Sequence, residues 1–289
     1  MANIQYLSQF PSIFSQRILN ELVKNGESKK LSRFITESQF LEKEDKIKYG
    51  DLFDNIFNYL LKNYRCEYVY KNLLANELLL ARHSLNSSSI ITELRVGNAK
   101  ADVVILNGTS TVYEIKTELD NFDRLNHQLE EYKKFFDKIF IVTHHSIINK
   151  ISNTFDEGLG LIQLSEDHKI ETLREAKSNK GNVIPLTIFD SFRKNEYTKI
   201  ILDYFGYIPE VPNTRIYTEC KELFGLISPS EAHDIMVEVL RTRSSKEKYE
   251  NRIRLMPDSL RLLVLESQLK DQEYLQLEKA FNSNFEFFC

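Results

Sequence analysis

The chain has 289 residues and a mass of 34.0 kDa, a length that corresponds to about two domains. Hydrophobic residues make up 42% and charged residues 28%, a balance that excludes wholesale disorder. The formal net charge of -4 excludes a uniformly basic nucleic-acid-binding coat, although it leaves room for a local basic patch.

No apolar run approaches the ~18–20 residues that a membrane span needs, so we expect no membrane partner. The amphipathic N-terminal stretch lacks the compact apolar region and cleavage site of a signal peptide, which favours a cytoplasmic protein. Three separated cysteines, without a CxxC pair, suit a reducing compartment and give almost no support for a zinc site. They are Cys66, Cys220 and Cys289.

Residues 1–65 are expected to form a helical N-terminal extension. Apolar residues recur at helical spacing from Ile13 to Val23 and from Tyr49 to Leu61. The charged stretch from Asn25 to Lys48 fits a loop with short helices. Tyr68 to Ala81 predicts one more helix before the hydrophobic period changes.

Alternating patterns follow this helix. Ile90–Val96 and Ala101–Leu106 are predicted strands on either side of Gly97-Asn98, a two-residue hairpin signal. A third strand is expected at Thr111–Thr117, after a turn at Asn107–Ser110. The three strands predict an antiparallel meander.

Helical spacing returns from Asp120 to Asp137, and a fourth strand is expected at Lys138–Thr143. A short helix at Ser146–Phe155 and strands at Leu159–Leu164 and Ile170–Leu173 follow. This order predicts an α/β domain.

The α/β core is expected to span residues 66–180, and the helical C-terminal region residues 185–289. Ser228-Pro229-Ser230-Glu231 is a capping box with proline at the first helical position, so a helix should begin there. Pro257 should open another helix. Its apolar side would carry leucines at helical spacing: Leu262, Leu265 and Leu269.

The first hairpin carries paired charges. If Gly97-Asn98 is a two-residue turn, opposed positions sum to 195, which sets Glu93 opposite Asp102 and Arg95 opposite Lys100. Opposed carboxylates repel unless a cation joins them or one takes a proton, so Glu93 and Asp102 are candidate metal ligands. Glu93 also fits an ion pair with Arg95 or Lys100. These two cations are candidate phosphate-binding residues or solubilising edge charges.

Glu114 and Lys116 on the third strand are two residues apart, so they share a face. The second hairpin brings Asp102 toward Glu114, with a register left open because its loop could hold two to four residues. Carboxylates suit Mg²⁺ or Mn²⁺, which lower the pKa of a bound water and stabilise charge on a phosphate. The lysine can orient that water or neutralise developing charge.

Asp102 followed by Glu114-Ile115-Lys116 resembles the D…ExK core of the PD-(D/E)XK nuclease superfamily. The order of elements is similar to its restriction-endonuclease-like αβββαβ core, here with helical N-terminal and C-terminal extensions. Gln128 and Tyr132 resemble the QxxxY motif of the branch typified by the RecB nuclease domain. Ala101 stands where the family usually has proline. The resemblance covers roughly residues 66–165.

The resemblance implies a role for each matching residue. Asp102 and Glu114 would bind the metal, and Lys116 would position or activate the attacking water. Gln128 and Tyr132 would contact a phosphate or a base, the tyrosine by stacking.

The superfamily usually adds an acidic residue from the first core helix, and Glu77 matches it in position. The expected function is a Mg²⁺- or Mn²⁺-dependent nuclease that hydrolyses phosphodiester bonds in DNA, with RNA left open as a substrate. Stand-alone members of the superfamily favour a role in defence against phage or mobile DNA.

A catalytically silent nuclease-like module that binds nucleic acid or protein is the alternative, because the pI is acidic, at about 6.0, and the helical additions are large. The C-terminal helices are the expected place for a homodimer contact or a protein partner.

Overall fold

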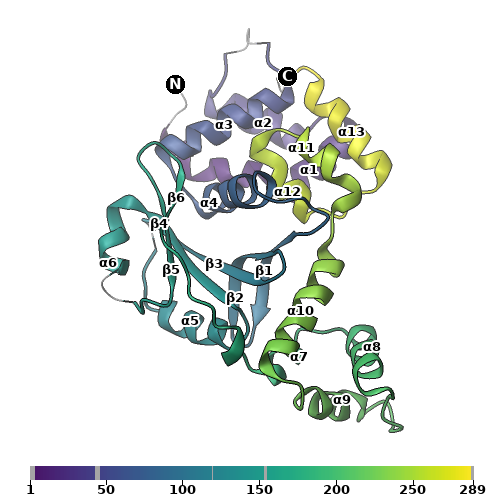
Figure 1. Ribbon diagram of the computed structural model, residues 1–289. Coiled ribbons are helices and arrows are strands. Elements are labelled where there is room, and N and C mark those ends of the chain that lie inside the picture. Colours follow the sequence, from purple (N-terminus) through teal and green to yellow (C-terminus); the bar gives the residue numbers. More distant parts are fainter. Residues whose placement is uncertain (1–3, 43–45, 119, 153–154, 288–289) are drawn as a thin grey trace. The chain divides into compact units, whose positions relative to one another are not determined.

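The computed structural model describes residues 4–42, 46–118, 120–152 and 155–287. The chain divides into two compact units. Figure 1 shows the ribbon, coloured from purple at the N-terminus to yellow at the C-terminus. The first unit contains residues 1–84 and 246–289, and the second contains residues 85–245. The six-stranded sheet lies in the second unit.

The first unit is built from helices of both ends of the chain. The C-terminal helix α13 packs against α1 and α3, and the rings of Phe53 and Phe281 lie 6.2 Å apart. Two chain segments far apart in sequence therefore share one core. The elements are η1 (Ile4–Ile13), α1 (Gln16–Asn25), α2 (Lys29–Ser38), α3 (Tyr49–Asn63), α4 (Glu67–Leu74), the π-helix η2 (Ala75–Leu80), η5 (Glu247–Tyr249), α11 (Glu250–Arg254), η6 (Asp258–Leu260), α12 (Arg261–Glu266) and α13 (Asp271–Asn282).

Helix α4 belongs to this first unit, whereas the sequence placed it at the start of the α/β core. Its side chains bind the C-terminal segment: Tyr68 donates to the carbonyl oxygen of Ser259 at 2.6 Å, and Asn72 donates to that of Asp258 at 2.9 Å. The expected C-terminal region, 185–289, is divided between the two units at Lys246.

The helix expected after Pro257 is shorter than its leucine pattern suggests. Helix α12 ends at Glu266, so Leu269 lies outside it, although Leu269 is buried. The backbone N–H of Lys270 donates to the carboxylate of Glu273 at 2.7 Å, a capping contact that starts α13 instead.

The second unit contains one mixed sheet in the order β1-β2-β3-β4-β5-β6. The first three strands form the predicted antiparallel meander, β4 and β5 continue it in parallel, and β6 is antiparallel to β5. The α/β class is therefore confirmed. The strands are β1 (Ser89–Val96), β2 (Ala99–Leu106), β3 (Ser110–Lys116), β4 (Lys138–His144), β5 (Gly160–Leu164) and β6 (Ile170–Arg174).

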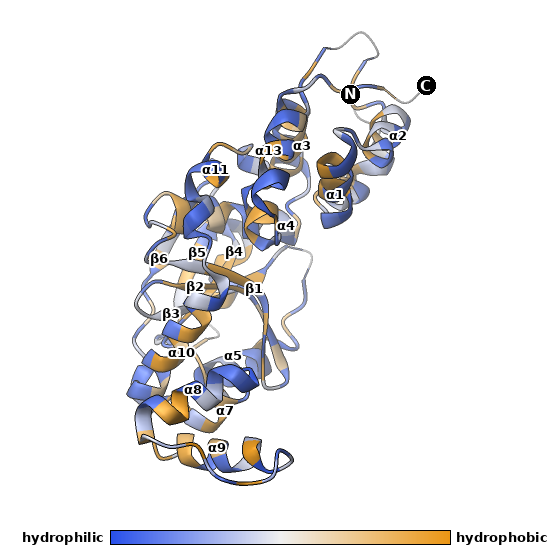
Figure 2. Cartoon of the chain, turned by 90° about the vertical axis from the view of Figure 1, so that its right-hand side faces the viewer, coloured by the Kyte–Doolittle hydropathy of each residue, from blue (hydrophilic) through white to orange (hydrophobic). Residues whose placement is uncertain are grey.

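Helix α5 (Leu125–Lys133) connects the parallel strands β3 and β4 and packs against β2 and β4. It is shorter than the expected Asp120–Asp137 at both ends. On the N-terminal side, the carboxylate of Asp120 accepts the backbone N–H of Thr117 at 2.8 Å and forms a turn before the helix. Figure 2 shows α5 as largely hydrophilic, which fits a helix that buries only one side.

Further helices follow the sheet strands, and α10 packs against β1, β2 and α7. Its start at Pro229 is confirmed, with Ser228 as the N-cap. Of the helix expected at Ser146–Phe155, residues 153 and 154 lie outside the described residues. The elements are η3 (His145–Ile147), α6 (Ile148–Ser152), η4 (Lys180–Asn182), α7 (Pro185–Phe189), α8 (Lys194–Phe205), α9 (Ile216–Phe224) and α10 (Pro229–Ser244).

The core of the second unit joins the sheet to α5 and the later helices. Apolar residues from strands, such as Val104 and Val112, cluster with Leu129 of α5 and Met236 of α10. Within the segments that the structure describes, no helix is both long and apolar enough to cross a membrane.

Candidate functional site

The turn between β1 and β2 sets the register of the first hairpin. Gly97 has a φ of 54°, in the left-handed region that such a turn requires and that glycine adopts without a Cβ clash. The ladder pairs Arg95 with Lys100 and Val96 with Ala99, so the predicted register is confirmed.

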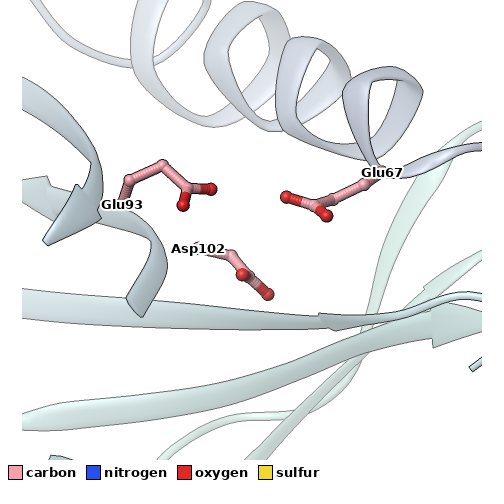
Figure 3. A group of neighbouring side chains, drawn as sticks. All are labelled: Glu67, Glu93 and Asp102. Carbon is pink, nitrogen blue, oxygen red and sulfur yellow. The ribbon is translucent and has the colours of Figure 1, made fainter. Parts of the chain in front are cut away.

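The same register sets Glu93 across from Asp102. Figure 3 shows both side chains, and a carboxylate oxygen of one lies within 4.8 Å of one of the other. Glu93 is exposed, has a φ of 59° that is uncommon outside glycine, and forms an ion pair with Lys100. The sequence left metal binding and an ion pair open for Glu93, and the structure contains the ion pair with Lys100. Glu67, also labelled in Figure 3, belongs to α4 of the first unit.

The second hairpin has a three-residue loop, which settles the register that the sequence left open. Val103 pairs with Tyr113, so one further step along the ladder sets Asp102 across from Glu114. Oδ2 of Asp102 accepts the backbone N–H of Ile115 at 2.8 Å. This hydrogen bond ties the Asp102 carboxylate to β3.

Glu114 is a carboxylate with no exposed surface, and two side chains donate hydrogen bonds to it. The Nζ of Lys116 lies 2.8 Å from its Oε1, and the hydroxyl of Tyr132 donates to its Oε2 at 2.7 Å. Burial raises the pKa of Glu114, while the charge and hydrogen bond of Lys116 and the hydrogen bond of Tyr132 oppose that shift. The ionised form is thus the one that its neighbours favour.

Helix α5 brings the glutamine and tyrosine of the QxxxY pattern to the same place. They are one turn apart, so they share a side of the helix. The Nζ of Lys116 donates to Oε1 of Gln128 at 3.1 Å, and the Tyr132 hydroxyl also lies 2.9 Å from the carbonyl oxygen of Lys100. Lys116 is therefore held between Glu114 and Gln128.

The stacking role expected for Tyr132 does not fit its position. The side chain is fully buried, so no base can reach its ring. Burial raises its pKa, and the negative charge of Glu114 and the hydrogen bond to it raise it further. Tyr132 therefore remains a neutral hydrogen-bond donor that positions Glu114.

The structure also places the two remaining predicted residues. Arg95 is exposed beside the turn, opposite Lys100. Glu77 lies in the π-helix η2, which belongs to the first unit.

The sequence motif does not include one residue that supports the lysine. Thr143 pairs with Lys116 across β4 and β3, and its hydroxyl donates to the Lys116 carbonyl oxygen at 2.7 Å. The feature that could have indicated this role is the position of Thr143 near the end of β4, which is parallel to β3. The neighbouring His144 lies 3.3 Å from Glu118 and contacts the hydroxyl of Ser146 at 2.8 Å.

A hydrogen-bonded set results from strands β2 and β3 and helix α5. It contains two carboxylates, an ammonium group, an amide and a phenol, which together can bind a hard cation and hold a proton donor beside it. Its members are Asp102, Glu114, Lys116, Gln128 and Tyr132.

A family model described as bacteriophage P4 protein cII matches residues 61–264. Protein cII of Enterobacteria phage P4 is 27% identical over 177 residues, which are 60% of this chain. The chain spans 59% of the length of that curated relative. The matched range contains every predicted site residue.

Among solved structures, the chain is similar to the SPO1766 protein of unknown function from Silicibacter pomeroyi. The sequences are 16% identical, the match covers 42% of this chain and 84% of that one, and the TM-score is 0.29.

Proposed function

The chain belongs to the family of the bacteriophage P4 protein cII, and within it we propose that this protein is a metal-dependent nuclease acting on DNA. Neither the family description nor the name of the relative states an activity. The proposal rests on the geometry of the site and on the resemblance to the PD-(D/E)XK superfamily.

The topology of the second unit supports a restriction-endonuclease-like core. The antiparallel strands β1, β2 and β3, the helix α5 and the parallel strand β4 follow the βββαβ order that the resemblance implies. The helix that precedes them in sequence, α4, belongs to the first unit.

The observation that carries the proposal is the connection from Tyr132 through Glu114 and Lys116 to Gln128. Three consecutive hydrogen bonds join these side chains, at 2.7, 2.8 and 3.1 Å. Residues that match a motif only by chance would not be expected to form one hydrogen-bonded network. Asp102 is fixed to the same strand through Ile115.

The donor set fits a divalent cation. Asp102 and Glu114 would supply the hard oxygen ligands that Mg²⁺ and Mn²⁺ prefer. When bound, Mg²⁺ or Mn²⁺ would lower the pKa of a water and stabilise charge on the phosphate. Lys116 would orient the attacking water, Gln128 would position Lys116, and Tyr132 would hold Glu114.

The exposed cations Arg95 and Lys100 would bind the DNA phosphates next to the site. Lys100 now pairs with Glu93, so this role requires a phosphate to compete with that carboxylate. Glu93 would then be available as a further, weaker ligand near Asp102.

Cleavage of circular and linear DNA, single- and double-stranded, with Mg²⁺ or Mn²⁺ tests the proposal. Wild type should cut, and Asp102→Asn, Glu114→Gln and Lys116→Met should each lose the activity. The ion pair of Glu130 and Lys133 on the exposed side of α5 offers matched controls. Glu130→Gln and Lys133→Met should therefore leave cleavage unchanged. Cleavage that persists in Asp102→Asn and Lys116→Met would refute it.

A catalytically silent binding module is the second candidate. The observation that favours it is the complete burial of Glu114 between Lys116 and Tyr132, an arrangement that also serves as a structural ion pair. Calorimetric titration with Mn²⁺ separates the two. A module of this kind should show no heat of binding that Asp102→Asn or Glu114→Gln removes.

A role in defence against phage or mobile DNA stays a prediction from the resemblance. Toxicity of the expressed wild-type protein that disappears in Lys116→Met, but not in Lys133→Met, would support it. Equal growth of cells with all three proteins would contradict it.

A further inference from the structure

The first unit contains a basic groove that the nuclease proposal does not use. It has a volume of about 580 Å³ and lies along α1 and α2, which belong to this unit and are labelled in Figure 1. Four cations and one carboxylate line it together with an amide: Arg17, Glu21, Asn25, Lys29, Lys30 and Arg33. The charge of the lining is opposite in sign to that of the whole chain, which is -4.

A short connection brings the two helices together. Helix α1 ends at Asn25, and Gly26 follows with a φ of 74° and donates its N–H to Leu22, so the chain turns back at once. Ser28 then caps α2 by accepting the N–H of Leu31 at 3.2 Å. Lys29 and Lys30 are therefore fixed at the first turn of α2.

The single carboxylate of the groove is already neutralised. Glu21 accepts a hydrogen bond from the Ser28 hydroxyl at 2.7 Å and one from Arg17 at 3.2 Å. Hydrogen bonds from Ser28 and then Arg17 hold the pKa of Glu21 below its ordinary value, against the effect of burial. Glu21 is thus ionised and engaged, and it does not neutralise the lysines.

Lys29 and Lys30 are exposed, and neither ammonium group forms an ion pair with the part of the chain that the structure describes. Two positive charges in the first turn of a helix destabilise it, because the positive end of the helix dipole lies there. A bound anion would relieve this repulsion. Lys29 and Lys30 therefore lower the stability of α2, and an anionic ligand would offset this loss.

The apolar residues of the two helices argue against a lipid surface as the ligand. Ile18, Leu19 and Leu22 of α1 and Leu31 and Ile35 of α2 are buried. Helices that bind membranes present such residues outward to enter the lipid. A groove that is lined by cations, on helices whose apolar residues face the core, fits the row of phosphates along a nucleic-acid backbone instead.

We propose that the groove between α1 and α2 binds the phosphate backbone of a nucleic acid. The contact does not depend on base sequence, because ammonium and guanidinium groups at a phosphate read charge and spacing only. It also stands apart from the cleavage proposal, since no residue of the groove belongs to the second unit.

The test uses the whole 289-residue chain in EDTA, so that binding is measured without cleavage. Fluorescence anisotropy with a labelled duplex and a labelled single strand compares wild type with the double variant Lys29→Ala/Lys30→Ala. The matched control is Lys62→Ala/Lys279→Ala, which removes two exposed lysines of the same unit outside the groove.

The groove variant should bind about tenfold more weakly at low salt, and the slope of log K against log salt should fall by about 2. The control should keep the wild-type affinity and slope, and both should unfold at the wild-type temperature. Equal losses in both variants, or no loss in the groove variant, would overturn the proposal.

Co-sedimentation with vesicles of phosphatidylserine and phosphatidylcholine completes the test. Vesicle binding that the groove variant loses, with DNA binding unchanged, would assign the groove to a lipid surface and overturn the proposal. The cleavage assay remains a separate readout, because Asp102→Asn should abolish cutting while it leaves groove-dependent DNA binding intact.

Discussion

The hydroxyl of Tyr132 on α5 donates a 2.7 Å hydrogen bond to Oε2 of Glu114, a carboxylate on β3 that has no exposed surface. The same hydroxyl lies 2.9 Å from the carbonyl oxygen of Lys100, so one proton faces two acceptors. A single phenol thereby links the helix to two adjacent strands at the site.

Tyr132→Phe should lower both stability and cleavage. The variant keeps the ring but leaves Oε2 of the buried Glu114 without its donor, which costs about 1.5–3 kcal/mol. Urea unfolding measures the loss, and the cleavage assay measures the second effect. Tyr207→Phe changes an exposed tyrosine of the same unit and should alter neither. Unchanged stability in Tyr132→Phe would show that the Glu114 carboxylate finds another donor.

The Glu114–Lys116 pair should show strong coupling in a double-mutant cycle. Each of Glu114→Gln and Lys116→Met leaves the other charge buried without its partner, a change that typically costs about 3–5 kcal/mol. The double variant removes both charges and should be about as stable as wild type, yet inactive. Additive losses in urea unfolding would contradict a coupled buried pair.

Asp137→Asn should destabilise the second unit at neutral pH. The buried carboxylate of Asp137 accepts the Thr109 hydroxyl at 2.6 Å and the backbone N–H groups of Asn179 and Lys180 at 3.1 and 2.9 Å. An amide cannot accept at both ends, so the expected loss is about 1.5–3 kcal/mol. Glu157→Gln, an exposed acid of the same unit, is the control.

The effect of Asp137 should also depend on pH. Burial raises its pKa, but hydrogen bonds from Ser178, Thr109 and the backbone outweigh this and lower it below its ordinary value of 3.8. Its contribution is therefore present above pH 3.8 and is lost as the pH falls through the lower folded value. The stability gap between wild type and Asp137→Asn should narrow in acid. A gap that widens would contradict this sign.

His233 should give a second pH dependence, near neutrality. It is fully buried on α10, with Nε2 2.8 Å from the Ser110 hydroxyl and Nδ1 3.3 Å from Asp234. Burial lowers its pKa below 6.5, against the charges of Asp234 and Asp137 and together with that of Lys180. The folded state thus prefers the neutral ring, whose contribution is present above pH 6.5 and is lost as the pH falls toward the folded value.

His233→Gln replaces the ring by an amide that does not titrate. Its stability deficit relative to wild type should be larger at about pH 7.5 than at about pH 5, measured by urea unfolding. A deficit that grows in acid would mean that the charged ring is the stabilising form.

Local signals predicted the meander and its first register well. Gly97 adopts the left-handed backbone of a two-residue turn, and the alternating residues around it form β1 and β2. Helical spacing placed Gln128 and Tyr132 on one side of α5. These features depend on neighbours along the chain, and a sequence carries such information directly.

Contacts between distant residues could not be predicted in the same way. The sequence does not show that Tyr68 binds the Ser259 carbonyl, 191 positions later, and this contact draws α4 into the first unit. Nor does it show that Tyr132 is fully buried, because a tyrosine at helical spacing fits either a core or a binding surface. Because Tyr132 is buried, it holds Glu114 and does not stack on a base.

The division of the chain has a consequence for folding during synthesis. The first unit needs residues 246–289 to complete its core, whereas the second unit is finished at residue 245. Because the ribosome delivers the chain from its N-terminus, the sheet with its site can form while α1 to α4 still lack α13. The nascent chain should therefore acquire protease resistance first in its middle segment and only later at its beginning.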